Sequence, residues 1–393
     1  GEGSSIRAIH GGAGAGSSGL TSRHSHPPCF LFANPSMPIA WLGAQPQGSQ
    51  PHRCAHISGA RPPAFPQEAR RRPGALRSLV SSQEGAGRGD GAMAAAEALE
   101  SAIRDLSESS VPEPEASAEV LLSAVMGVSR SRIRLQGRAM AMSDEQTATF
   151  KRYISERQTR LPVQYILGEW EFYNLDRILV RPPTLIPRPE TEELVDLIIK
   201  AHPQPPETFL EVGPGSGVIS LALLKAWPQC RATAVDLCEH AVRLTSDNAE
   251  LLGMSDRISV VHSGISEYTQ SAAASPRSFD LIVSNPPYIP SEEMKDLEAE
   301  VIDHEDSIAL DGGPDGLDVV REILVAAEKL VRDGGGIWME VDRSHPERLA
   351  LDESPANGVS FEEWMRDMSG KPRFVKYAVR RSSEKQGVKG IER

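Results

Sequence analysis

Short apolar runs recur along the C-terminal part of the chain, and stretches with helical periodicity separate them. Such runs are typical of buried strands in a parallel sheet, because both faces of these strands are covered. The predicted strands are 209–212, 232–235, 258–261, 280–283, 337–341 and 373–379, and the predicted helices are 218–226, 240–252 and 317–331. This alternation predicts one α/β domain with a doubly wound sheet over residues 205–381.

Residues 93–160 have a helical pattern. Leu99, Ile103 and Leu106 recur at helix spacing, and Pro112 and Pro114 separate this first helix from the second. We expect a small helical domain that packs on a larger one and recognises a partner. A domain that only adds stability would show the same pattern.

Residues 161–204 connect the two domains. Apolar residues alternate in 161–172 and again in 177–180, which predicts a hairpin. The loop that follows, 186–192, reads Ile-Pro-Arg-Pro-Glu-Thr-Glu, and its acidic residues favour the start of a helix. Apolar residues at helix spacing in 194–201 continue this connecting helix.

The two ends of the chain lack periodicity. Residues 1–92 are rich in Gly, Pro, Ser and Arg, and residues 382–393 are polar, so we expect a disordered leader and a flexible tail. Residues 1–90 contain nine Arg, no Lys and four acidic residues, a composition typical of an organelle transit segment. Translated upstream sequence would look the same, and Met93 is a candidate start.

Charge and composition limit the possible partners. The leader of residues 1–90 has a net charge of +5 and the remainder has −17, which disfavours nucleic acid as a partner. The four cysteines form no CxxC pair and have no His at ligand spacing, so we expect reduced thiols and no metal site. No apolar run approaches the roughly 20 residues that span a bilayer.

A glycine-rich loop follows the strand at 209–212. It reads Gly213-Pro214-Gly215-Ser216-Gly217, directly after Glu211 and Val212, and an apolar helix follows. Glycines permit close approach of the backbone, and the helix N-terminus presents unpaired N–H groups. The next strand ends at Asp236, whose carboxylate can accept both hydroxyls of a ribose. This order predicts a nucleoside-type ligand, although a tight turn alone would also use glycines.

The strand at 280–283 leads into Asn285-Pro286-Pro287-Tyr288. Because two prolines remove two amide donors, the backbone here can only accept hydrogen bonds. The Asn285 side-chain oxygen and the Pro286 carbonyl could each accept one N–H of a planar NH2 group, while Tyr288 covers its flat face. A proline turn that merely closes a strand is the alternative.

Together, these motifs resemble those of class I S-adenosylmethionine-dependent methyltransferases. More narrowly, the chain resembles the HemK or PrmC family of release factor glutamine N5-methyltransferases, and animal mitochondrial members most. Three further segments carry the narrower likeness: 162–168, 186–192 and 309–316. The likeness extends from about Glu115 to Arg381.

The resemblance implies a Rossmann-like fold with a small N-terminal helical domain. It implies that S-adenosylmethionine binds at the strand ends and that Asp236 holds its ribose, with Ile265 over the purine. The other cofactor-binding residues implied are Glu211, Gly213, Pro214, Gly215, Ser216, Gly217 and Asn285. The family often has an acidic residue before this apolar position, where this chain has Gly264.

For the substrate, the resemblance implies the glutamine of the Gly-Gly-Gln loop of a peptide-chain release factor, in support of translation termination. Asn285, Pro286 and Tyr288 are the implied catalytic residues. The implied substrate-binding residues are these three with Pro287, Arg188 and Glu190. We expect a mitochondrial monomer. An adenine-N6 methyltransferase acting on nucleic acid is the alternative enzyme, and a non-catalytic module that binds cofactor and release factor is the alternative of another class.

Overall fold

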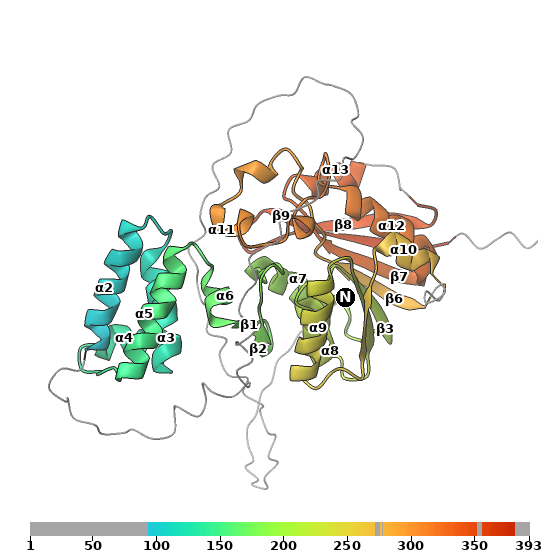
Figure 1. Ribbon diagram of the computed structural model, residues 1–393. Coiled ribbons are helices and arrows are strands. Elements are labelled where there is room, and N and C mark those ends of the chain that lie inside the picture. The colour runs from blue at the N-terminus through green and yellow to red at the C-terminus, as the bar shows by residue number, and fades with distance from the viewer. Residues whose placement is uncertain (1–92, 272–275, 277, 352–355, 382–393) are drawn as a thin grey trace, which may run out of the picture. The chain divides into compact units, whose positions relative to one another are not determined.

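The computed structural model of this chain describes residues 93–271, 276, 278–351 and 356–381. The main sheet has seven strands in the order β5-β4-β3-β6-β7-β9-β8 (Figure 1). Its strands are β3 (Thr208–Val212), β4 (Arg231–Asp236), β5 (Ile258–His262), β6 (Phe279–Ser284), β7 (Val331–Glu340), β8 (Val359–Arg366) and β9 (Pro372–Val379). Strands β3 to β7 pair in parallel, whereas β9 is antiparallel to both β7 and β8.

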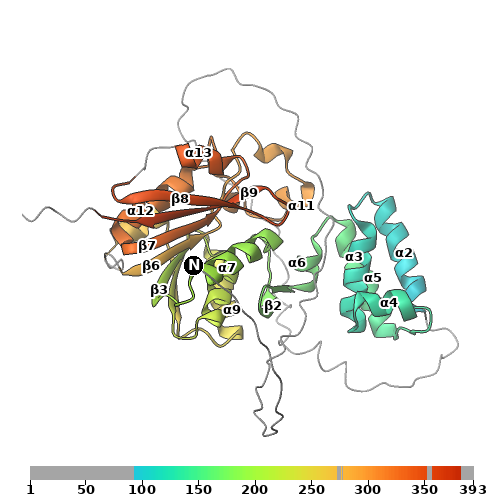
Figure 2. The same ribbon diagram turned by 180° about the vertical axis from the view of Figure 1, so that it is seen from behind.

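Helices cover both faces of this sheet (Figure 1 and Figure 2). One face packs against α7 (Pro189–Ala201), α8 (Val218–Ala226) and α9 (Glu239–Leu251), and the other against α10 (Ile265–Gln270), α12 (Asp318–Leu330) and α13 (His345–Leu351). Successive strand residues point to opposite faces. Accordingly, Phe209 belongs to the first buried cluster and Leu210 to the second. The predicted doubly wound sheet is confirmed.

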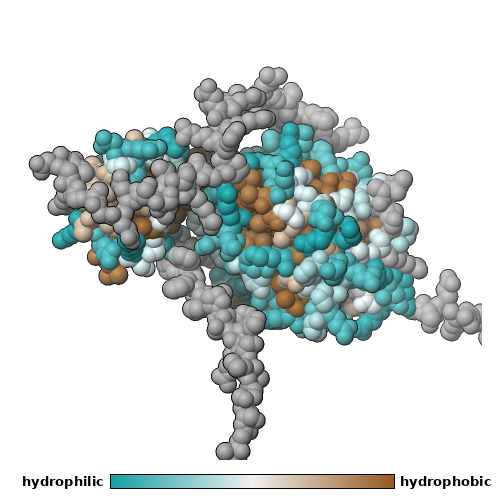
Figure 3. Space-filling model, turned by 90° about the horizontal axis from the view of Figure 1, so that it is seen from below, coloured by the Kyte–Doolittle hydropathy of each residue, from teal (hydrophilic) through white to brown (hydrophobic). Residues whose placement is uncertain are grey.

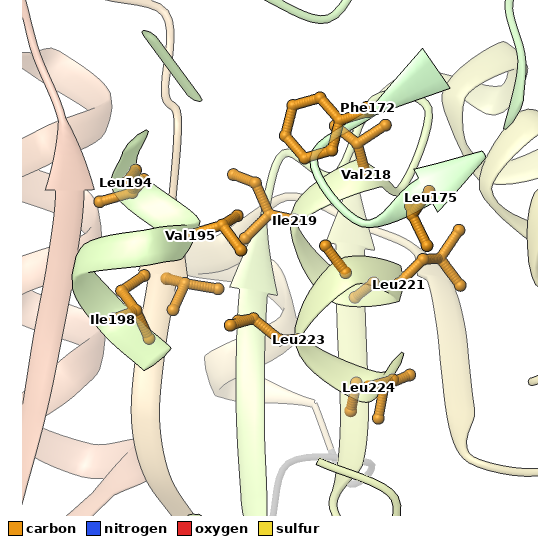
Figure 4. Close-up of a cluster of buried hydrophobic side chains, with 14 of the residues drawn as sticks. Phe172, Leu175, Leu194, Val195, Ile198, Val218, Ile219, Leu221, Leu223 and Leu224 are labelled. Atoms are coloured by element: carbon orange, nitrogen blue, oxygen red, sulfur yellow. The ribbon is translucent and has the colours of Figure 1, made fainter. Parts of the chain in front are cut away.

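The connecting segment forms a hairpin of β1 (Glu169–Phe172) and β2 (Leu175–Leu179). Figure 4 shows Phe172 and Leu175 of this hairpin beside Val218 and Leu221 of α8, in one buried cluster. The hairpin is therefore anchored in the core of the sheet domain.

The prediction that the hairpin begins near residue 161 was wrong. Val163–Leu167 forms the short helix α6, in which Tyr165 and Ile166 donate N–H bonds to the Pro162 carbonyl. Gly168, with φ +73°, ends it in the left-handed conformation that favours glycine. The buried residues of α6 are the adjacent Tyr165 and Ile166, so the apparent alternation did not reflect a strand.

The N-terminal helices share a separate core. They are α2 (Ala95–Glu108), α3 (Pro114–Met126), α4 (Arg130–Gln136) and α5 (Asp144–Gln158). Leu106, Leu121, Leu122, Ile133 and Phe150 are buried together among them. Pro114 is the first residue of α3, where its missing N–H costs nothing.

Several elements escaped the sequence prediction. Strand β8 carries charged residues and lies at the edge of the sheet, and β7 begins before its glycine run instead of after it. The helices α10 and α13 were not predicted, nor were the short turns η2 (Met294–Asp296), α11 (Ala299–Ile302) and η3 (Ser307–Ala309). The expected leader, 1–92, and tail, 382–393, lie outside the described residues.

Hydrophilic residues predominate on the face drawn in Figure 3, where the hydrophobic residues form separate patches. No helix in the described part of the chain has the length and apolarity to cross a bilayer. Across the same residues, no three His, Cys, Asp or Glu side chains gather in a way that could hold a metal ion.

Candidate active site

The carboxyl ends of adjacent parallel strands bring the predicted motifs together. Val212 at the end of β3 pairs with Ser284 of β6 on one side and with Val235 of β4 on the other. The residues that follow these strand ends are therefore neighbours at one edge of the sheet, where open α/β folds bind ligands. The glycine loop lies between Asp236 and Asn285.

Each glycine of the loop has a positive φ, at +69° for Gly213, +58° for Gly215 and +83° for Gly217. A side chain would be strained in this conformation. A Cβ on Gly217 would also lie 2.9 Å from Cγ2 of Thr245, whereas a Cβ on Gly213 would meet nothing within 4 Å. Gly217 is thus required for packing, and Gly213 leaves open space beside the loop.

Helix α9 fixes the glycine loop from behind. The Thr245 hydroxyl donates to the Gly215 carbonyl at 3.0 Å, and Asn248 Nδ2 donates to the Ser216 carbonyl at 2.9 Å. Asn248 also exchanges hydrogen bonds with the backbone of Leu179 in β2. The sequence analysis missed these two side chains. Two polar residues one helical turn apart within an apolar pattern were the available signal.

Glu211 is buried beneath the loop. Its Oε2 accepts the N–H of Ser220 at 2.9 Å in the first turn of α8, where Gly217 has no side chain to cap the helix. Its Oε1 is buried and has no hydrogen-bond partner. Burial raises the pKa of Glu211 to about 7. An unpaired buried carboxylate oxygen suits a ligand with N–H donors, above all a cationic one.

Asp236 is held by the backbone on both sides. Its Oδ2 accepts the N–H of Gly215 at 3.2 Å, and its Oδ1 accepts the N–H of Cys238 at 2.8 Å. Burial raises the pKa of Asp236. Each oxygen keeps a lone pair for a further donor, as binding to a pair of hydroxyls requires.

Two apolar side chains follow the ends of β4 and β5. Ile265 is buried at the start of α10. Leu237 is 62% exposed directly after Asp236, and a Cβ on Gly264 would lie 3.2 Å from its Cδ2. The sequence analysis did not identify Leu237. A large apolar residue immediately after the strand-terminal acid was the signal for it.

The amide nitrogen and the amide oxygen of the Asn285 side chain have different surroundings. Nδ2 donates to Thr191 Oγ1 at 3.1 Å. No described residue donates a hydrogen bond to Oδ1 or to the Pro286 carbonyl. Tyr288 is half-buried, and burial together with Glu340 raises the pKa of its hydroxyl. Segment 285–288 therefore carries two acceptors without a donor among the described residues, and an aromatic side chain at Tyr288.

A second glycine-rich loop supports this segment from behind. Ile289 donates its N–H to the Leu310 carbonyl at 3.0 Å, and Gly312 donates to the Ile289 carbonyl at 2.8 Å. A Cβ on Gly312 would lie 2.7 Å from the Pro287 carbonyl oxygen. A Cβ on Gly316 would lie 2.3 Å from the Tyr288 carbonyl oxygen. Gly312 and Gly316 thus lie too close to the backbone of Pro287 and Tyr288 to carry side chains.

The loop before α7 reaches the same place. Arg188 donates to Glu305 Oε2 at 2.7 Å, and Glu305 is a buried residue. Burial raises the pKa of Glu340 to about 7. Glu190, in the first turn of α7, contributes to this rise through its negative charge. The contact with Glu305 shows Arg188 in a structural ion pair, and its expected contact with substrate stays a prediction, as does that of Glu190. The sequence analysis missed Thr191, Glu305 and Glu340.

Known proteins resemble this chain in sequence over both its helical domain and its sheet domain. The family model for the PrmC N-terminal domain matches residues 97–168, and that for the methyltransferase small domain matches residues 189–313. Human MTRF1L release factor glutamine methyltransferase is 39% identical over 283 residues, which cover 69% of this chain and 83% of the human protein. The release factor glutamine methyltransferase of Caulobacter vibrioides is 36% identical over 237 residues, or 60% of this chain and 80% of that protein. The release factor glutamine methyltransferase of Koribacter versatilis is 34% identical over 255 residues, which cover 63% of this chain and 86% of that protein. By these matches, this chain belongs to the PrmC/HemK family of release factor glutamine methyltransferases.

Proposed function

We propose that this enzyme methylates the side-chain nitrogen of the glutamine in the Gly-Gly-Gln loop of a peptide-chain release factor, with S-adenosylmethionine as methyl donor. One observation carries the proposal. Asn285 Oδ1 and the Pro286 carbonyl are two unpaired acceptors at a strand end next to the glycine loop. The names of the relatives support the same substrate class. They favour glutamine over adenine, which also offers a planar NH2.

The residues at the glycine loop fit the cofactor. The unpaired Oε1 of Glu211 suits its amino group, and the open space beside Gly213 admits its amino-acid part. Asp236 can accept its ribose hydroxyls, and Leu237 with Ile265 offers apolar surface for its purine. When bound, the cofactor supplies a methyl group on a positively charged sulfur.

The two acceptors can make an amide nitrogen, which is a poor nucleophile, more reactive. The lone pair of an amide nitrogen is delocalised into its carbonyl. Two oxygens fixed on the N–H bonds of the substrate favour a pyramidal nitrogen and aim its lone pair. They also stabilise the positive charge that develops on nitrogen, which is electrostatic preorganisation. Tyr288 is protonated at neutral pH, as an ordinary tyrosine is, and burial raises its pKa further, so its ring covers the amide without acting as a base.

Methyl transfer to purified release factor tests the proposal. Tritiated S-adenosylmethionine supplies the label, and mass spectrometry locates the modified residue. We expect label on wild-type release factor, none on a release factor whose Gly-Gly-Gln glutamine is replaced by alanine, and none on DNA. Asn285→Ala should reduce turnover by about 10²-fold or more, as loss of one preorganised group does in other enzymes. Urea unfolding should show an intact fold. Near-normal turnover in this variant would refute the acceptor pair.

We further propose that the enzyme is located in mitochondria. The Arg-rich, acid-poor composition of residues 1–90 supports this location. Mass spectrometry of the N-terminus of the endogenous protein, purified from isolated mitochondria, tests it. Recovery of the protein only from the cytosol would contradict the proposal.

A further inference from the structure

Three side chains from three elements form a hydrogen-bonded row behind the acceptor pair. Thr191 lies in the first turn of α7, Asn285 follows β6, and Glu340 ends β7. The Thr191 hydroxyl donates to Glu340 Oε2 at 2.8 Å. The same hydroxyl oxygen accepts from Asn285 Nδ2 at 3.1 Å.

The donors and acceptors available in this row determine which way each hydrogen bond runs. A hydroxyl has one proton to donate and lone pairs to accept with. When the Glu340 carboxyl is ionised, the Thr191 hydroxyl donates its proton to it, and only lone pairs of the hydroxyl face Asn285. The Asn285 amide must then turn its NH2 toward Thr191 and its oxygen away from it. With the amide turned over, two acceptors would face each other at Thr191.

Neither member of the pair behind Asn285 is placed to touch a substrate. Thr191 is 4% exposed and Glu340 is 1% exposed. The strand register explains why Glu340 is within reach, since Ser284 pairs with Met339 and the next residues on both strands are Asn285 and Glu340. Arg373, Glu190 and Arg188 also act on Glu340 electrostatically.

We propose that Thr191 and Glu340 are positioning residues, which orient the Asn285 amide so that its oxygen faces the substrate glutamine. This inference rests on the proposed function for its substrate. It goes beyond that function by assigning the orientation of the acceptor to two buried side chains. The same hydrogen bonds also tie α7 to β7, so a purely structural role has to be separated from a positioning role.

Paired threonine variants separate the two roles. Thr191→Val removes the hydroxyl, and Thr191→Ser restores it. Thr208→Val is the matched control, because the Thr208 hydroxyl donates to the Ser278 carbonyl at 2.7 Å at the start of β3, away from the strand ends that carry the site. Each variant is assayed for kcat and KM with release factor, for cofactor Kd by calorimetry, and for stability in urea.

We expect Thr191→Val to lower kcat about 10²-fold with the cofactor Kd changed less than about threefold, by analogy with loss of one preorganised group. Thr191→Ser should recover kcat to within about threefold of wild type, and Thr208→Val should leave kcat unchanged. Equal kcat values for Thr191→Val and Thr208→Val would overturn the proposal. So would a Thr191→Ser variant as slow as Thr191→Val.

A measurement without substrate keeps the inference independent of the proposed function. The side-chain ¹⁵N–¹H signals of Asn285 can be assigned by their loss in Asn285→Ala. They should shift in Thr191→Val and stay in place in Thr191→Ser and Thr208→Val. If they do not shift in Thr191→Val, the positioning role fails even when the enzyme methylates release factor. If they shift but wild type does not methylate release factor, the proposed function fails and the positioning role stands.

Discussion

Gly316 offers a way to move the proposed glutamine pocket without changing any side chain in it. It belongs to the loop behind segment 285–288 and has a φ of +75°. In Gly316→Ala, the new Cβ would lie 2.3 Å from the Tyr288 carbonyl oxygen, and 2.8 Å from Cε1 of the buried His345.

The expected effect follows from this distance. Carbon and oxygen approach each other to about 3.3 Å in close contacts, so the two backbones must separate by roughly 1 Å. A misplacement of about 1 Å at reacting groups can cost about 10²-fold in rate. A non-glycine residue in the left-handed conformation also costs about 1–2 kcal/mol of stability. Overpacking at this contact adds about 1–3 kcal/mol to that loss. We therefore expect a large loss of kcat together with a loss of stability of a few kcal/mol.

Gly334→Ala is the matched control. Gly334 has a φ of +82°, and a Cβ there would meet nothing within 4 Å. It should lose only the backbone cost of about 1–2 kcal/mol in urea unfolding and keep its kcat. Both variants are assayed with release factor at saturating cofactor, so that altered cofactor binding does not enter the comparison. If Gly316→Ala and Gly334→Ala have the same kcat, the second glycine loop does not position the pocket and the reasoning is refuted.

Three further predictions concern the cofactor side and the ion pairs. Gly213→Ala should weaken cofactor binding in calorimetry, because the new side chain occupies the open space beside the loop and strains a φ of +69°. Burial raises the pKa of Glu211 from 4.5 to about 7, so the folded state holds this proton more tightly than the unfolded state. The free energy of unfolding should therefore fall as pH rises from about 4.5 to about 7, and Glu211→Gln should remove roughly 3 kcal/mol of that fall in urea titrations. Arg188→Met leaves the Glu305 carboxylate, whose side chain is 1% exposed, without its partner and should cost about 3–5 kcal/mol, whereas Arg181→Met at an exposed ion pair should cost less than about 1 kcal/mol.

Each of these predictions has a clear contrary result. An unchanged cofactor Kd in Gly213→Ala would place the ligand elsewhere. Identical pH dependence of stability in wild type and Glu211→Gln would mean that this carboxyl titrates normally in the folded protein. Equal stability losses in Arg188→Met and Arg181→Met would show that burial of the Arg188–Glu305 ion pair does not increase the cost of breaking it.

The neighbourhood of the main motifs could be predicted because it depends on strand order alone. Parallel strands place their carboxyl ends at the same edge of the sheet, so Asp236, Gly213 and Asn285 meet once β3 lies between β4 and β6. Apolar runs suffice to predict such strands. The family likeness then supplied the expected role of each motif.

The contacts behind the motifs could not be predicted from local pattern. Thr191 and Glu340 are 149 positions apart, and their hydrogen bond exists only after α7 packs beside the end of β7. Helix α6 was misread because a five-residue segment contains too few turns to show its period. Strand β8 was missed because an edge strand with charged residues lacks a continuous apolar run.

Glu211 and Leu237, at the two ends of the proposed cofactor site, differ in how freely they can be substituted. Glu211 holds helix α8 with one oxygen, and the other is the one proposed to bind the cofactor, so a change there disturbs the scaffold along with the proposed site. Leu237 extends into solvent and has little packing to lose. Variants meant to accept donors with enlarged purines should therefore be built at Leu237, with the carboxylate beneath the loop left as it is.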